Sequence, residues 1–261
     1  MLHPEKTAII LHNAVVSDIP TYTRIAHSMN TNVVNLTGQR RISKDEPWLT
    51  SPRIIPLVPL AIAAQIRRYR AFDHGLAAFS LDQCLALFPD HAHNAQGAFT
   101  PFALAPSTAW ISPHQPIFVR PNSGGKSFPG QVIEHHPDAW TLRQTTYNIL
   151  PNELIFIGPD NDPGPEIRTW IGPKGIYAHS AYTHPNEPTT HPAIVTDTLL
   201  HLGHIIGQRI QQHTGMDTSF VVDFSMKNPI YPKIIEWNNP YTSGTYDANP
   251  SALLHGLQEY P

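Results

Sequence analysis

The sequence predicts a fold of mixed α/β class. Short β-prone runs alternate with helical stretches along its 261 residues, and segments rich in glycine or proline separate them. One stretch, Ala193–His213, carries its apolar residues on a single helical stripe and is followed by Gly215, a residue suited to a helix C-cap. With 27 prolines and only 14% charged residues, long exposed helices are not expected to dominate.

The N-terminal region is predicted to form a smaller α/β unit over residues 1–113. Its expected elements are strands at Lys6–Leu11 and Thr31–Leu36, and helices around Tyr22–Met29, at Leu57–Phe72 and at Leu81–Phe88. Ser80 and Gln83 have the spacing of a capping box at the start of the last helix. The proline-rich segment Pro101–Pro116 is expected to link this unit to a larger domain over residues 114–261.

The larger domain is predicted to open with a strand, a loop and a second strand in the segment PIFVRPNSGGKSFPGQVI, Pro116–Ile133. Arg120 ends the first strand, and the loop contains Gly124, Gly125 and Lys126. Backbone N–H groups of adjacent glycines can converge on an anion, and the lysine adds a mobile charge. An ordinary hairpin whose glycines serve the turn fits the pattern as well, and the GxxxxGK[ST] phosphate-loop signature is absent.

A further strand is predicted at Pro165–Ile171, where Glu166, Arg168 and Trp170 share one face and isoleucines occupy the other. The acid and the arginine could form a surface ion pair, which contributes little to stability. Alternatively, the acid could bind ribose hydroxyls while the guanidinium binds a phosphate or carboxylate through its planar fork. The spacing alone does not choose between these interpretations.

Three oxygen-bearing side chains follow on two later β-prone runs. Glu236 and Asn238 lie two apart in PKIIEWNN, so they share a strand face, and Asp223 lies in SFVVDF, which could form the neighbouring strand. Carboxylate and amide oxygens suit Mg²⁺, a hard cation that keeps phosphates in its coordination shell. An edge strand with polar surface residues is the simpler alternative.

Composition limits the classes of partner and compartment. A net charge of -3 gives no support for a nucleic-acid partner. The single cysteine, Cys84, cannot form an internal disulfide and fits a reducing cytoplasm. No secretory signal opens the chain, no apolar stretch reaches 18 residues, and a membrane partner is not expected. The histidine pairs His91-x-His93 and His135-His136 lack zinc-site spacing, and the sequence does not indicate an oligomeric state.

The order of these motifs, from Ile117 to about Asp247, resembles the ATP-grasp superfamily. Within it, RPNSGGKSFPGQVI, PEIRTWI and EWNNPYTSGTYD resemble the R-two-K clade, which is frequent in phage and bacterial genomes. The resemblance implies an ATP-grasp fold with a smaller N-terminal α/β domain. It also implies a Mg²⁺- and ATP-dependent ligase of the cytoplasm, or of a host's cytoplasm if phage-encoded. Such a ligase joins the carboxylate of a small molecule or peptide to an amine through an acylphosphate. A small-molecule kinase and a non-catalytic nucleotide-binding protein are the alternatives.

The resemblance assigns roles to individual residues. Arg120 and Lys126 would bind phosphates, although many ATP-grasp enzymes carry a lysine at the position of Arg120. Lys126 and Arg168 would be catalytic, Glu166 and Arg168 would line the nucleotide and substrate pocket, and Asp223, Glu236 and Asn238 would bind the metal. The base would lie against Leu154–Gly158, which includes Ile155, Phe156 and Ile157. The loop residues Thr242, Ser243 and Gly244 could bind a substrate carboxylate or oxyanion, or could serve the turns of their own backbone.

Overall fold

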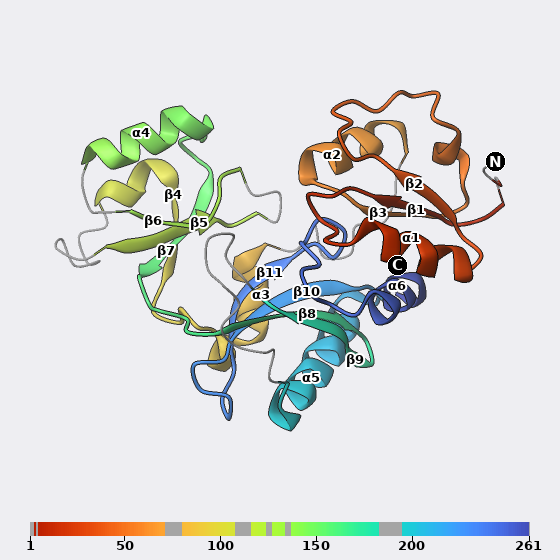
Figure 1. Cartoon of the computed structure of the whole chain (residues 1–261). Helices are drawn as coiled ribbons and strands as arrows, with labels where there is room; N and C mark the ends of the chain where they lie inside the picture. Colours follow the sequence, from red (N-terminus) through yellow and green to blue (C-terminus); the bar gives the residue numbers. More distant parts are fainter. Residues whose placement is uncertain are drawn as a thin grey trace.

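The computed structural model of the chain describes residues 3, 5–70, 80–107, 116–123, 127–133, 137–182 and 195–260. These residues form one sheet of three strands and two sheets of four strands. Figure 1 shows three lobes: the N-terminal sheet at the upper right, the second sheet at the left, and the third sheet below and between them.

The N-terminal unit is a parallel sheet of order β2-β1-β3. Its elements are β1 (Ala8–Leu11), α1 (Ile19–Ser28), β2 (Asn32–Asn35), a short 3-10 helix η1 (Pro47–Thr50), β3 (Ile54–Leu57) and α2 (Leu60–Tyr69). Strand β1 is buried on both faces, with Ile9 packed in the cluster that includes α1 and Ile10 in the cluster that includes α2. Burial on both faces explains why β1 is a continuous apolar run.

One predicted helix of this unit, Leu57–Phe72, has the wrong start. Ile54–Leu57 forms the strand β3, and α2 begins only at Leu60, after Val58 and Pro59. The run from Ile54 to Leu60 is apolar throughout, so periodicity could not separate a buried strand from the start of a helix. The end of the predicted helix, from residue 71, lies outside the described residues.

The second sheet has the order β4-β7-β5-β6, and all its strand pairs are antiparallel. Its strands are β4 (Ala98–Pro101), β5 (Ile117–Pro121), β6 (Gln131–Ile133) and β7 (Leu154–Pro159), and two helical segments accompany it, η4 (Phe102–Ser107) and α4 (Pro137–Tyr147). The predicted hairpin is confirmed as β5 and β6. Strand β4 precedes the expected boundary at residue 113 and pairs with β7, which follows it.

The third sheet, of order β11-β10-β8-β9, is antiparallel and carries most of the candidate site. Its strands are β8 (Glu166–Gly172), β9 (Gly175–Ala181), β10 (Phe220–Ser225) and β11 (Lys233–Asn238). The helices around it are α3 (Leu81–Leu87), followed by η3 (Pro89–His91), α5 (Asp197–Thr214) and α6 (Pro250–Glu259).

Helix α5 covers one face of the third sheet, as its apolar stripe predicts. Leu199 and Ile206 pack in the same cluster as Ile167 and Ile171 of β8. The opposite face of β8 carries Trp170, which packs with the N-terminal unit and α6. Gly215 ends α5 with a φ of 69°, confirming the predicted C-cap. Among the described residues, no helix combines the length and apolar character needed to cross a membrane.

Candidate active site

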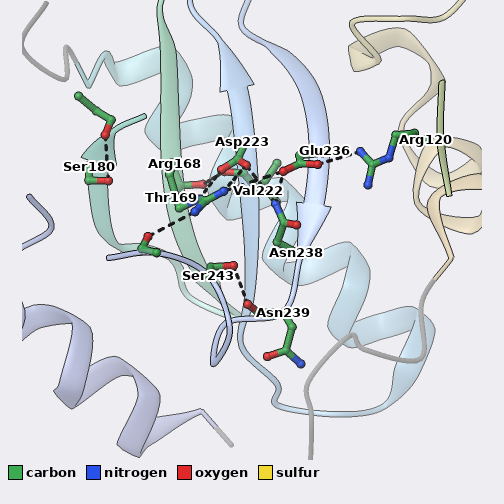
Figure 2. Close-up of polar contacts among 12 residues, drawn as sticks. Arg120, Arg168, Thr169, Ser180, Val222, Asp223, Glu236, Asn238, Asn239 and Ser243 are labelled. Carbon is green, nitrogen blue, oxygen red and sulfur yellow. Dashed lines mark hydrogen bonds and ion pairs between the residues drawn. The ribbon is translucent and has the colours of Figure 1, made fainter. Parts of the chain in front are cut away.

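The centre of the candidate site is a pair of carboxylates on neighbouring strands. Asp223 of β10 lies directly opposite Glu236 of β11 in the antiparallel register. Asn238, two residues beyond Glu236 on the same strand, donates from Nδ2 to Asp223 Oδ2 (3.0 Å) and to Glu236 Oε1 (2.7 Å) (Figure 2). The structure therefore brings Asp223, on the adjacent strand, beside Glu236 and Asn238, which the sequence predicted to share a strand face.

Arg168 joins this group from the next strand. On β8 it lies opposite Asp223, and its guanidinium binds that carboxylate in a bidentate fork, with Nε to Oδ1 and Nη2 to Oδ2 both at 2.8 Å. Arg168 is 5% exposed and Asp223 is 0% exposed, so this is a buried ion pair. The alternative of a surface ion pair is thus wrong for Arg168, because its partner is an acid on another strand and both side chains are out of solvent.

Two further contacts hold the Arg168 side chain. Nη1 donates to the carbonyl oxygen of Gly244 at 3.3 Å. The guanidinium carbon lies 4.6 Å from the ring centre of Tyr182 and 5.2 Å from that of Tyr246. Neither tyrosine was singled out by the sequence, because its distance from Arg168 along the chain follows no motif spacing.

A second cation reaches the site from the second sheet. Arg120, on β5, places Nη1 3.1 Å from Glu236 Oε2, and Figure 2 shows its side chain approaching from the side opposite Arg168. Arg120 is 5% exposed. The second and third sheets therefore meet through an ion pair at the carboxylates.

Burial sets the protonation chemistry of the group. It raises the pKa of the Glu166 carboxyl to about 8, and the nearby charges of Asp223 and Glu236 add to that rise. Burial also raises the pKa of Asp223, while Arg168 opposes the rise. For Arg168, burial disfavours the cation, but the Asp223 carboxylate outweighs it and raises the arginine pKa further above its ordinary range. Arg168 therefore stays charged in this setting.

The segment expected to lie against the nucleotide base has a clear packing role. Ile155 and Ile157 are 0% exposed and pack with Trp140 of α4 in the core of the second sheet. Phe156 points to the other face and joins the cluster that includes Ile167 and α5. Their contact with a base stays a prediction.

The remaining residues that the sequence assigned to the site lie in the glycine-containing loop and in the loop 239–248. Lys126, with Gly124 and Gly125, lies outside the described residues. Ser243 donates from Oγ to the carbonyl of Asn239 at 2.7 Å, so its hydroxyl serves the loop's own backbone. Gly244 contributes its carbonyl to Arg168, and Thr242 is half-buried nearby.

The donor set suits a hard divalent cation. Among the described residues, no group of three or more histidine, cysteine, aspartate or glutamate side chains is arranged to hold a metal ion. However, Asn238 Nδ2 lies between one oxygen of each carboxylate, where a positive group is favoured. Rotation of the amide would present its oxygen there instead, giving with the two carboxylates the oxygen ligands that Mg²⁺ prefers.

Comparisons with known proteins identify the family and the fold. The sequence matches the family described as ATP-grasp domain, R-two-K clade family 2, over residues 103–255. No curated protein matches the sequence.

The fold is similar to those of many solved structures, including the following three. D-cycloserine synthetase DcsG has a TM-score of 0.61 at 11% identity, with 97% of this chain and 98% of that chain covered. D-alanine–D-alanine ligase from Bacillus anthracis complexed with ATP has a TM-score of 0.55 at 13% identity, covering 98% and 96%. ATP-grasp ligase PsnB complexed with a minimal precursor has a TM-score of 0.51 at 11% identity, covering 98% and 99%.

Proposed function

The chain belongs to family 2 of the R-two-K clade of ATP-grasp domains, and we propose that it is an ATP-dependent ligase that joins a carboxylate to an amine through an acylphosphate. One observation carries the proposal. Two buried arginines from different sheets, Arg120 and Arg168, converge on the carboxylates of Asp223 and Glu236. Fixed cations beside a carboxylate pair are what a phosphoryl-transfer site needs to hold negatively charged oxygens.

Each residue has a role in this proposal. Arg120 binds the nucleotide phosphates, and Arg168 orients the substrate carboxylate or the phosphoryl group that it receives. Glu236, Asn238 and Asp223 hold Mg²⁺, which supplies charge neutralisation on the phosphate oxygens when it is bound. In this proposal the protein itself forms no covalent bond with the substrates. Its contribution is to bind acid, nucleotide and amine together, which removes most of the entropic cost of their encounter.

The substrates are proposed to be amino-acid-like or peptide carboxylates and amines. The similar structures include a D-alanine–D-alanine ligase and a ligase complexed with a precursor. The loop 239–248, which contains Thr242, Ser243 and Gly244, borders Arg168 and is the proposed place where the substrate is distinguished. The reducing cytoplasm is the proposed compartment, in keeping with the single cysteine.

A nucleotide-turnover screen against amino acids, polyamines and peptides tests this function. We expect ADP to accumulate only when an acid and an amine are both supplied with Mg-ATP. Hydroxylamine in place of the amine should trap the acid as its hydroxamate. A stable phosphorylated product that forms without an amine would point to a kinase, and failure to bind Mg-ATP in calorimetry would exclude both activities.

A Glu236→Ala variant tests the assignment of the metal site. It should lose turnover and weaken Mn²⁺ binding, measured by electron paramagnetic resonance, while keeping the circular dichroism spectrum of the wild type. Glu259→Ala is the matched control, because Glu259 is an exposed glutamate of α6 that pairs with Lys174, outside the group around Asp223. Unchanged turnover in Glu236→Ala would refute the assignment.

A further inference from the structure

The guanidinium of Arg168 is contacted by three segments of the chain: β10, the residue after β9, and the loop 239–248. Asp223 of β10 binds one edge, the carbonyl of Gly244 accepts from Nη1, and the two tyrosine rings lie at 4.6 Å and 5.2 Å. The rings of Tyr182 and Tyr246 also contact each other edge to face, with centroids 5.3 Å apart. Within the part of the chain that the structure describes, these hydrogen bonds use three of the five N–H groups of Arg168, and Nη2 also lies 3.9 Å from Glu236 Oε1.

Within this group, Tyr246 has a backbone conformation that is unfavourable for a non-glycine residue. Its φ of 44° is in the left-handed region, which a bulky residue rarely adopts. Such a conformation persists only where surrounding contacts impose it. The contacts that the backbone of Tyr246 makes therefore explain why this conformation is kept.

Those contacts come from the N-terminal unit. Ser17, in the loop between β1 and α1, donates from Oγ to the carbonyl of Tyr246, and its own N–H donates to Thr245 Oγ1 at 3.4 Å. The N–H of Thr245 donates to the carbonyl of Val15 at 2.8 Å. Thr245 is 0% exposed, so its bond to Val15 is buried, whereas Ser17 and its bond to Tyr246 lie at the surface. The β1–α1 loop thus holds the backbone of Tyr246 while its ring lies against Arg168.

We propose that Tyr246 is a positioning residue for Arg168, and that the β1–α1 loop of the N-terminal unit sets its place through Ser17. The hydrogen bonds to Asp223 and to the carbonyl of Gly244 hold the edges of the guanidinium, and the rings of Tyr182 and Tyr246 lie near it. An aromatic ring against the planar cation restricts its tilt and stabilises the charge through a cation–π contact. The N-terminal unit thereby helps to set the orientation in which the guanidinium of Arg168 meets a bound ligand. The inference rests on the proposed function only where it predicts a change in turnover.

Substitutions of Tyr246 test the proposal by two independent measurements. In nuclear magnetic resonance, the Nε–Hε signal of Arg168, identified by its loss in Arg168→Lys, should move toward that of an unstacked arginine in Tyr246→Leu. It should stay near the wild-type position in Tyr246→Phe, which keeps the ring. In turnover, Tyr246→Leu should lower kcat and kcat/KM together by about 5- to 30-fold, and Tyr246→Phe should restore most of the loss. Tyr231→Leu, at a 69% exposed position, is the matched control.

The two measurements separate failure of this proposal from failure of the proposed function. If no substrate pair is turned over, the resonance of Arg168 still tests the positioning. An unchanged resonance in Tyr246→Leu would overturn the proposal, and so would an equal loss in the Phe and Leu variants, because the ring would then not be the cause. Should Tyr246→Leu fail to fold, Ser17→Ala removes only the hydrogen bond from Ser17 Oγ to the carbonyl of Tyr246. It should shift the same resonance in the same direction, and an unchanged signal would refute the proposed role of Ser17.

Discussion

Arg168 and Asp223 bury two opposite charges that depend on each other. A fork of two hydrogen bonds at 2.8 Å compensates for the loss of water around both groups. Burial of a single charge without a partner is far more costly than burial of the pair. The ion pair therefore fixes the relative position of the two side chains, and removal of either one would leave the other buried without its counterion.

Substitution of Asp223 by Ala should destabilise the protein strongly. The variant leaves Arg168 buried without its main counterion, so we expect the free energy of unfolding to fall by about 3–5 kcal/mol in urea titrations. The double variant Asp223→Ala/Arg168→Met should recover part of this loss. Glu259→Ala, which breaks the exposed pair of Glu259 with Lys174, is the control and should leave stability unchanged. If Asp223→Ala changed the free energy of unfolding only slightly, Arg168 would not depend on Asp223 as its main counterion.

Glu166 predicts a pH dependence of stability in metal-free, nucleotide-free protein. Its pKa is raised from an ordinary value of 4.5 to about 8, so the folded state holds a proton that the unfolded state releases between these values. The contribution of Glu166 to stability is therefore full below pH 4.5 and is lost as pH rises toward 8. After allowance for partial exposure, this loss is about 1–3 kcal/mol.

The Glu166→Gln variant should lack this loss. Melting temperatures measured from about pH 5 to pH 9 should show the variant gaining on the wild type as pH rises. Asp18→Asn, at an exposed carboxyl whose pKa is lowered mainly by a backbone hydrogen bond from Thr21, should not reproduce the gain. Parallel curves for wild type and Glu166→Gln would refute the raised pKa.

At the scale of the elements, α5 depends on glycines as much as on its apolar stripe. The stripe alone indicates which face is buried, and the structure confirms that face. How closely the helix approaches the sheet depends on Gly207 and Gly203. A Cβ on Gly207 would lie 2.2 Å from the carbonyl oxygen of Gly172, whereas one on Gly203 would meet side-chain carbons of Ile176 at 2.4 Å. The first obstacle is backbone and the second is a side chain that can change rotamer.

Substitution of Gly207 by Ala should therefore be the more damaging of the two changes. We expect it to lower the free energy of unfolding by about 2–4 kcal/mol, because the helix must move away from the β8–β9 turn. Gly203→Ala should cost less, since Ile176 can repack. Urea unfolding of both variants measures the difference, and equal costs would show that the backbone contact does not limit the approach of α5.

At the scale of the whole molecule, the candidate site exists only where three lobes meet. The ion pair of Arg120 with Glu236 connects the second sheet to the third. The contacts of Val15 and Ser17 with Thr245 and Tyr246 connect the N-terminal unit to the same place. Figure 1 shows β10 and β11 between the other two lobes. A displacement of any lobe would thus alter the site.

Substitution of Arg120 by Ala tests the connection between the second and third sheets. It removes a buried cation from Glu236 and, in the proposed function, from the nucleotide phosphates. Calorimetry with Mg-ATP should show a Kd raised by about tenfold or more. Arg24→Ala, which removes an exposed arginine of α1, is the control. An unchanged Kd would exclude Arg120 from nucleotide binding.

Much of the local structure and the chemistry of the site could be predicted from the sequence alone. Alternation along a strand depends only on neighbouring residues, so the shared face of Glu236 and Asn238 and the buried face of α5 were both predictable. The order of motifs also indicated the ATP-grasp fold and the R-two-K clade, which the family match confirms. Residue type then limited the chemistry to cations, carboxylates and an amide.

Only the tertiary structure decided which of these groups are partners. Arg168 binds Asp223, 55 residues away, because the register of β8 against β10 places them opposite each other. Tyr246 reaches Arg168 because a loop of the N-terminal unit holds its backbone. Contacts of this kind depend on register and on the docking of lobes, and neither leaves a periodic signal in the sequence. The sequence by itself thus determined which chemical groups the site contains and which of them share a strand face. The fold as a whole determined the ion pairs of the site and the aromatic contacts with Arg168.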